Sequence, residues 1–203
     1  QSTLGRCSAS QPGQCKWNSY NVQSVGGGLI VANDSFRFYF GADSGNNAGN
    51  GQQGNSSTGV AELRRDGFAA IRCTDPHASC TITSRALMAA GRRRLFVNAN
   101  TTAGALRVVV LDAETQTVLP GFGKLDSTPL VGEDTTRAAL HWTKSPNLPM
   151  GVYRLQFVLE GRAQLFSFWA AVDACGASDG WMAAGGPGLG SSRDTHGSCT
   201  DKV

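Results

Sequence analysis

The sequence predicts an all-β protein whose main part is a β-sandwich of the jelly-roll type. Apolar and polar residues alternate over short runs, most clearly in Val152–Leu159, where Tyr153, Leu155, Phe157 and Leu159 share one face. Turn signals separate these runs at short intervals, which is typical of sandwiches. Glycine is plentiful at 26 residues, charged residues make up only 16%, and no long amphipathic helical pattern is present. A chain of 203 residues can bury one core with a small appended unit.

Residues 1–57 are expected to form the small N-terminal β unit. A disulfide-tied lead-in reaches Gly26–Gly28 and then the strand Leu29–Val31. The pair Asn33-Asp34 is a hairpin turn signal, and the strand Phe36–Phe40 follows it. Residues 41–57 are rich in Gly, Asn, Gln and Ser and are expected to be an exposed loop or linker.

Residues 58–172 are expected to form the sandwich itself, and residues 173–203 an irregular, Gly-rich tail tied down by a disulfide. Each expected strand of the sandwich is a short alternating run bounded by turn residues. These strands are Gly59–Arg65, Phe68–Arg72, Thr81–Met88, Arg94–Asn98, Ala105–Asp112, Thr136–Thr143, Val152–Leu159 and Gln164–Val172.

Six cysteines indicate an oxidising compartment. Their spacings do not match a zinc site, where pairs usually lie two to four residues apart, so disulfides are expected. Neighbours in sequence make local pairing economical, although six cysteines allow about 15 connectivities and the pattern stays open. The cysteines are Cys7, Cys15, Cys73, Cys80, Cys175 and Cys199.

Three acceptor sequons agree with that compartment. Asn33, Asn55 and Asn100 each begin an Asn-X-Ser/Thr triplet in a polar, turn-like segment. No apolar run is long enough to span a membrane, no signal peptide is visible, and Gln1 is expected to begin a processed or truncated chain. The protein is therefore expected to be extracellular or displayed at the cell surface.

No catalytic constellation, metal site or cofactor is predicted. A net charge of +3 is too small to indicate nucleic-acid binding, and the Arg92–Arg94 cluster is interpreted as a solvated strand end. Gly176–Gly180 matches the G-x-S-x-G nucleophile elbow, but the Gly- and Pro-rich segment after it cannot form the helix that the elbow requires. Three histidines are expected in loops or on solvent-facing positions: His77, His141 and His196.

The acidic candidates for the paired carboxylates that glycoside hydrolysis needs are Asp126, Glu133 and Asp134. Their place between strands favours turn formation, in which the side chain bonds nearby backbone amides. A calcium ion held by such groups is a weaker alternative.

A scaffold of this kind favours contact with glycans or with a partner. Four aromatic residues are candidates for stacking on a sugar: Trp17, Tyr20, Trp142 and Trp169. For the last two, which lie on strongly apolar strands, burial in the core is favoured instead. A third possibility is assembly, because the edges of a sandwich can pair with copies of the same chain or accept a donated strand, giving homo-oligomers or filaments.

Several segments resemble a known family. The segments are Thr58–Ala69, Arg94–Ala99, Leu106–Asp112, Leu119–Phe122 and Leu165–Trp169, of which the Leu63–Phe68 run is the most specific. They resemble the carboxy-terminal β-sandwich of sialidase-like, glycosyl-hydrolase-related β-propeller proteins. Val25–Val31 and Phe36–Gly41 resemble the closing strands of the propeller, and Gly180–Gly188 is similar to tails in that family. The cysteines and the sequons are not part of the family pattern.

The resemblance implies that the catalytic carboxylates, tyrosine and arginines of the family would lie in propeller blades preceding this chain, so none is carried over here. The expected function is therefore that of a non-catalytic extracellular module in structural assembly or in protein or glycan contact. The alternative is a C-terminal accessory part of a sialidase-like glycoside hydrolase whose propeller lies outside the chain.

Overall fold

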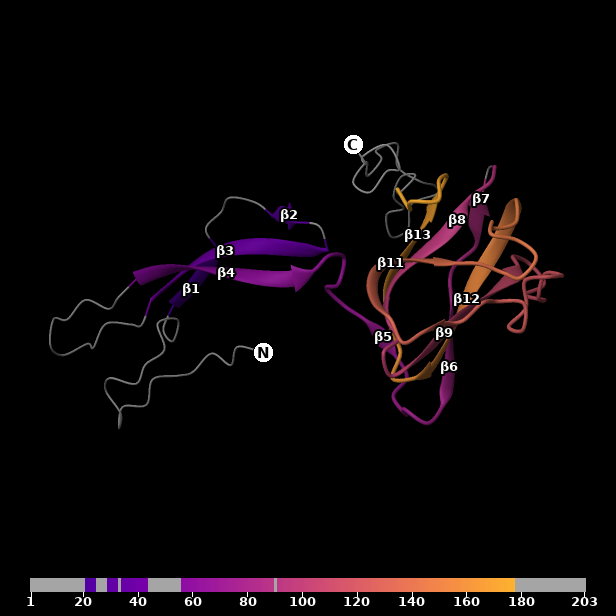
Figure 1. Ribbon diagram of the computed structural model, residues 1–203, viewed down its shortest axis with the longest axis horizontal. Helices are drawn as coiled ribbons and strands as arrows, with labels where there is room; N and C mark the ends of the chain where they lie inside the picture. The colour runs from indigo at the N-terminus through magenta and orange to yellow at the C-terminus, as the bar shows by residue number, and fades with distance from the viewer. Residues whose placement is uncertain (1–20, 25–28, 33, 44–55, 90, 178–203) are drawn as a thin grey trace, which may run out of the picture. The chain divides into compact units, whose positions relative to one another are not determined.

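The computed structural model describes residues 21–24, 29–32, 34–43, 56–89 and 91–177, and every regular element in these ranges is a β-strand. The chain divides into two compact units, Gln1–Arg65 and Asp66–Val203 (Figure 1). All strand pairs in both units are antiparallel, so the predicted all-β class is confirmed.

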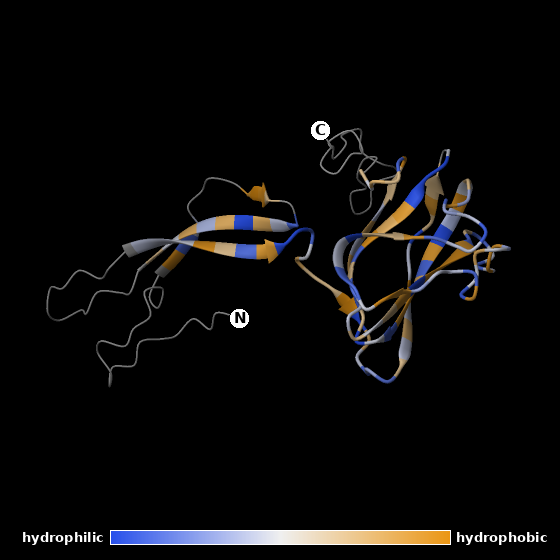
Figure 2. Cartoon of the chain, viewed as in Figure 1, coloured by the Kyte–Doolittle hydropathy of each residue, from blue (hydrophilic) through white to orange (hydrophobic). Residues whose placement is uncertain are grey.

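The first unit is an antiparallel sheet built around one long strand. That strand is β3 (Ser35–Asp43), and β4 (Ser56–Arg64) pairs with it over nine residues. On its other side β3 pairs with β1 (Asn21–Ser24) at one end and with β2 (Ile30–Ala32) at the other. Bands of apolar and polar residues alternate along β3 and β4 in Figure 2, as the two-residue repeat requires.

The strand β4 corrects one expectation from the sequence. Gly59–Arg65 was predicted to open the sandwich, but its residues pair with β3 in the first unit, and the boundary lies after Arg65. Register explains the difference, because Phe36 lies opposite Leu63 on the apolar face and Arg37 opposite Glu62 on the polar face, 3.9 Å from Nε to Oε2. An alternating pattern identifies a strand and its faces but does not identify its partner.

The second unit is the β-sandwich. In one sheet β9 (Gly104–Asp112) lies between β10 (Leu130–Val131) and β12 (Gly151–Gly161), and β6 (Ser79–Thr83) and β7 (Leu87–Ala89) pair with the other side of β12. The other sheet has the order β11, β8, β13, β5, with bounds Asp134–Leu140, Arg94–Asn100, Gln164–Ala171 and Ile71–Arg72.

Side chains from both sheets form one core between the layers. The inward residues alternate along the strands, and the predicted face of β12 (Tyr153, Leu155, Phe157 and Leu159) is buried. These residues pack with Leu95, Val97, Ala99, Leu106, Val108, Val110, Leu140, Trp142 and Leu165. A smaller cluster of Val109, Leu111 and Val158 is buried on the opposite face of the β9–β12 sheet.

In the first unit β1 was not predicted, and β3 and β4 extend into the expected loop 41–57 at residues 41–43 and 56–57. Beyond small shifts at strand ends, the sandwich differs from prediction at three places. The expected strand Thr81–Met88 is two strands, β6 and β7, which pair with successive parts of β12. Only Ile71–Arg72 of the expected Phe68–Arg72 is extended and paired, and the short strand β10 was not predicted. The described residues end at 177. The predicted tail, residues 173–203, therefore lies almost entirely outside them.

Candidate functional site

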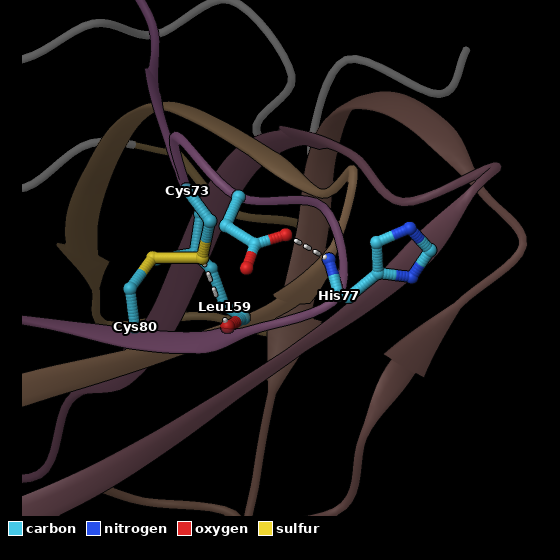
Figure 3. Close-up of a disulfide and its surroundings, with 5 residues drawn as sticks. Cys73, His77, Cys80 and Leu159 are labelled. Carbon is cyan, nitrogen blue, oxygen red and sulfur yellow. Dashed lines mark hydrogen bonds between the residues drawn. A yellow bond between two sulfur atoms is a disulfide. The ribbon is translucent and has the colours of Figure 1, made fainter.

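The Cys73–Cys80 disulfide lies where the chain crosses from one sheet of the sandwich to the other. Cys73 directly follows β5 in one sheet, and Cys80 lies within β6 of the other, with the two Cα atoms 5.7 Å apart (Figure 3). The Cys73 sulfur is buried 3.4 Å from the Leu159 carbonyl oxygen, a packing contact because a disulfide sulfur carries no proton. This bridge was one of the local pairings that the sequence favoured, and it fixes the start of β6.

Of the remaining cysteines, the structure describes only Cys175. Cys175 is also disulfide-bonded. Cys7, Cys15 and Cys199 lie outside the described residues, so the other two local pairings stay predictions.

The loop between the bridged cysteines is held by the side chain and the carbonyl of Asp75, and it carries His77. The His77 N–H donates to Asp75 Oδ1 at 2.8 Å, and the Ala78 N–H donates to the Asp75 carbonyl (Figure 3). The imidazole of His77 is exposed, and so is that of His141 after β11, as predicted for loop and solvent-facing histidines. His196 lies outside the described residues.

At Val108 the outer edge of β9 is closed by side chains, whereas Val110 and Asp112 bond there to the backbone of Thr117–Phe122. Val108 turns its N–H and C=O away from β12. On that outer side Ser127 Oγ accepts the N–H at 3.0 Å, and the Trp142 Nε1–H donates to the carbonyl at 3.1 Å. The guanidinium of Arg107 donates to the Ser127 carbonyl at 2.6 Å. Val108, Ser127 and Trp142 are all at most 3% exposed, so water does not compete for these bonds.

Two of the three predicted acidic residues, Asp126 and Glu133, take part in local bonding of the backbone. Asp126 Oδ2 accepts the Gly123 N–H at 3.0 Å, which confirms it as a turn former. Glu133 is exposed and contributes through its backbone, since its carbonyl accepts the Thr101 hydroxyl at 3.1 Å and its N–H donates to that hydroxyl. Asp134 is exposed at the first position of β11.

Two further aspartates, neither of them predicted as a site residue, also accept bonds from the backbone of a turn. Asp112 Oδ1 accepts the N–H groups of Glu114 and Thr115 and the Thr115 hydroxyl, and these bonds hold the pKa of its carboxyl below the ordinary value. Asp173 Oδ1 accepts the N–H groups of Cys175 and Gly176 at 2.9 and 2.8 Å. An Asp at the end of a strand-like run, where its carboxylate can accept backbone N–H groups two or three residues later, is the sequence signal that would have found both turns.

The glycine of the elbow-like motif has a packing role. Gly176 has φ +81°, and an added Cβ would lie 2.8 Å from Phe96 Cε1 and 2.9 Å from Arg137 Cδ. Its carbonyl accepts the Trp169 indole N–H at 2.8 Å. The segment after β13 therefore folds back over Phe96, and Ser178 lies outside the described residues.

The structure places two of the four aromatic candidates. Trp142 is 1% exposed and makes an edge contact with Phe122, so its ring is a core ring, as the favoured interpretation predicted. Trp169 is half-buried and stacks on Phe96 with centroids 5.8 Å apart. Trp17 and Tyr20 lie outside the described residues. The aromatic ring most exposed among those described is that of Phe68, at 69%, which sequence reasoning missed.

The sequon at Asn100 has an ordered geometry at the end of β8. Asn100 Oδ1 accepts the Thr102 N–H at 3.1 Å and the Thr102 hydroxyl at 2.7 Å. The Asn100 side-chain nitrogen has no hydrogen bond to another described residue. Asn33 and Asn55 lie outside the described residues.

Tyr153 is the ionisable group of the core whose proton affinity is most altered. It is 3% exposed on β12, and burial raises the pKa of its phenol to about 12, opposed in part by the charge of Arg93. Its position on the inner face makes it a core residue that stays protonated at neutral pH.

Within the described residues no group of three or more His, Cys, Asp and Glu side chains is placed to hold a metal ion. Across the same residues there is no helix long and apolar enough to cross a membrane. Comparison with protein families, with curated proteins and with solved structures finds no match to this chain. The fold and its polar contacts thus define an all-β protein with a disulfide-bridged sandwich.

Proposed function

We propose that the chain is a non-catalytic extracellular β-sandwich module that acts in structural assembly or in contact with protein or glycan partners. The observation that carries this proposal is the use of polar side chains in the sandwich. Ser127, Trp142, Asp126, Asp112 and Arg154 each bond to the backbone of the same unit. A sandwich whose polar side chains hold its own backbone is suited to serving as a rigid scaffold.

Arg154 illustrates this use of charge. Its Nε donates to the Ala113 carbonyl at 3.0 Å and its Nη1 donates to the Ser84 carbonyl at 3.2 Å. The planar guanidinium thereby ties the loop after β9 to the segment after β6, across the width of the sheet. An arginine engaged in this way supports a scaffold role better than an anion-binding role.

The extracellular location rests on the disulfide and on the Asn100 sequon. If the chain passes through a glycosylating compartment, Asn100 will carry a glycan, because this half-buried residue ends β8 beside the exposed Thr102 and its amide nitrogen bonds to no other described residue. Peptide mass after enzymatic deglycosylation in ¹⁸O water measures this. T102S should keep the modification, whereas N100Q and T102A should lose it. An unmodified Asn100 in secreted protein would contradict this part of the proposal.

The experiment that tests the function is the intact mass of the native protein together with electron microscopy of the purified chain. Particles of regular repeat support assembly, and a tightly associated partner supports a protein-contact role. Glycan-array binding that is lost in F68A but kept in L125A supports glycan contact, because both side chains are exposed and only one is aromatic. Hydrolysis of a glycoside by this chain, abolished by neutralising one carboxylate, would overturn the proposal.

The alternative is an accessory role in a sialidase-like glycoside hydrolase whose catalytic propeller is outside the chain. The resemblance of Leu63–Phe68 and the strands after it favours this alternative, as does an N-terminal unit that is an antiparallel sheet. A partner or a longer form of the protein that carries propeller blades, found in the same mass measurement, would favour it over independent assembly.

A further inference from the structure

The edge strands of the sandwich differ in how they are protected against pairing with another chain. Natural sheets protect their edges with very short strands, bulges or charged residues. β5 and β10 have two residues each. β11 has an irregular register between Thr135 and Ala138 and carries the charges of Asp134 and Arg137. These three edges therefore have the usual protection.

β6 has none of these protections. Its five residues Ser79–Thr83 pair with β12 in an unbroken register, and none of them is charged or proline. β6 lies at the border of its sheet in Figure 1. The exposed residues of β6 are Ser79, Thr81 and Thr83, whereas Cys80 and Ile82 are half-buried toward the core.

The backbone of β6 offers a regular row of donors and acceptors on its outer side. The Ser84 N–H donates to the Leu155 carbonyl at 2.8 Å, which sets the phase of the antiparallel ladder with β12. Residues 80 and 82 therefore turn their N–H and C=O toward β12, and residues 79, 81 and 83 turn theirs away. Those outward groups bond to no other residue that the structure describes.

The same strand is rigidly placed. The Cys73–Cys80 disulfide anchors it at one end, and the Gln156 Nε2–H bonds to Thr83 Oγ1 at 3.2 Å at the other. A partner strand would therefore meet an edge that is already extended, so little conformational entropy would be lost on this side of the contact.

We propose that β6 is a self-association edge, on which β6 of a second copy of this chain pairs antiparallel about a two-fold axis at Thr81. This inference rests on the assembly branch of the proposed function and names its contact. In that register Thr81 lies opposite Thr81 and Ser79 opposite Thr83, so uncharged β-branched and hydroxyl residues face one another, a favourable set of cross-strand pairs. About six backbone hydrogen bonds would form.

Charge at the two ends of the strand fits a second copy better than an unrelated acidic or basic peptide. Beyond Ser79 lies the loop that carries Asp75, and beyond Thr83 lies Arg85. An antiparallel pair brings the first end of one copy beside the second end of the other. Opposite charges therefore approach at both ends, which favours this orientation.

The test is sedimentation velocity of the full chain from about 1 to 100 µM, the range in which weak dimers populate. The wild-type chain should show a concentration-dependent dimer. T81K and T81E should each raise the dissociation constant about tenfold, because like charges then lie directly opposite on the axis. An equimolar mixture of the two variants should restore association by pairing the introduced ammonium with the introduced carboxylate.

A139K is the matched control, since Ala139 is exposed on β11, another edge strand of the sandwich. It should leave the dissociation constant unchanged. Circular dichroism and melting temperature of each variant separate a lost contact from a lost fold. Association that resists T81K, or that A139K weakens equally, would overturn the β6 assignment while leaving assembly in place. A monomer at every concentration would overturn both the β6 edge and self-assembly.

Discussion

Removing the Ser127 hydroxyl tests whether side chains close the outer edge of β9. S127A leaves the Val108 N–H without its acceptor, and Val108 is fully buried, so water cannot replace the lost 3.0 Å bond. An unsatisfied buried amide costs about 1–3 kcal/mol. The variant should therefore reduce the free energy of unfolding by that amount, a large share of the stability of a typical domain.

The assay is urea unfolding followed by circular dichroism, with T143A as the matched control. The Thr143 hydroxyl also bonds to a backbone group, the Asp126 carbonyl at 3.1 Å, but it is exposed and water can take its place. T143A should change the free energy of unfolding by less than about 0.5 kcal/mol. Equal effects of S127A and T143A, or an S127A protein as stable as wild type, would refute the reasoning.

W142F tests the second side-chain bond to Val108, the one to its carbonyl. It removes the indole N–H that bonds the Val108 carbonyl and shrinks the ring that contacts Phe122 at a centroid distance of 4.9 Å. The combined loss of a buried bond and of packing should cost about 2–5 kcal/mol. Because Ser127 and Trp142 both bond to Val108, the loss of unfolding free energy in the double variant should differ from the sum of the two single losses.

Three further changes probe the sandwich elsewhere. G176A should lower the free energy of unfolding in urea by about 2–4 kcal/mol, since it combines a left-handed backbone with overlap on the Phe96 ring. The control G132A, at φ +74° with nothing near its added Cβ, should lower it by only about 1–2 kcal/mol. Equal losses would contradict the overlap at Phe96. Replacing Cys73 and Cys80 by Ala should cost about 2–3 kcal/mol for a bridge spanning 7 residues, and an unchanged urea midpoint would refute this. The folded state holds the Tyr153 proton more tightly, with a pKa of about 12 against about 10 in the unfolded chain, so this proton stabilises the fold fully below pH 10 and the stabilisation is lost as the pH rises toward 12. Y153F should lack that part of the pH dependence of the free energy of unfolding. Identical pH profiles for wild type and Y153F would contradict the assignment.

Alternation along the chain was sufficient to predict the strands that carry the core. The inward face of β12 follows the two-residue repeat, and burial of that face is a local consequence of the pattern. β8 and β9 were predicted as strands too, but they are buried on both faces over most of their length, which alternation alone does not predict. The Cys73–Cys80 bridge was also within reach of sequence reasoning, because short spacing favours local pairing.

Partners were not within reach, since pairing depends on contacts between distant residues. β4 has the same alternation of apolar and polar residues as a sandwich strand, and only its pairing with β3 assigns it to the first unit. The closure of β9 depends on Ser127 and Trp142, which lie 19 and 34 residues from Val108, and a hydroxyl or an indole in a turn carries no local sign of that use. The exposed Phe68 follows the unit boundary, which the sequence placed too early.

The two outer edges of the β9–β12 sheet lead to opposite expectations for mutation. On the β9 side the backbone is satisfied within the unit, so substitutions of Ser127 should lower stability and leave association unchanged. On the β6 side the outward groups of Thr81 have no described partner, so T81K should weaken association and leave stability unchanged. Measuring both quantities for both variants separates residues that maintain the scaffold from residues that use it. A variant of either residue that altered both quantities together would show that the two edges are coupled through the sheet.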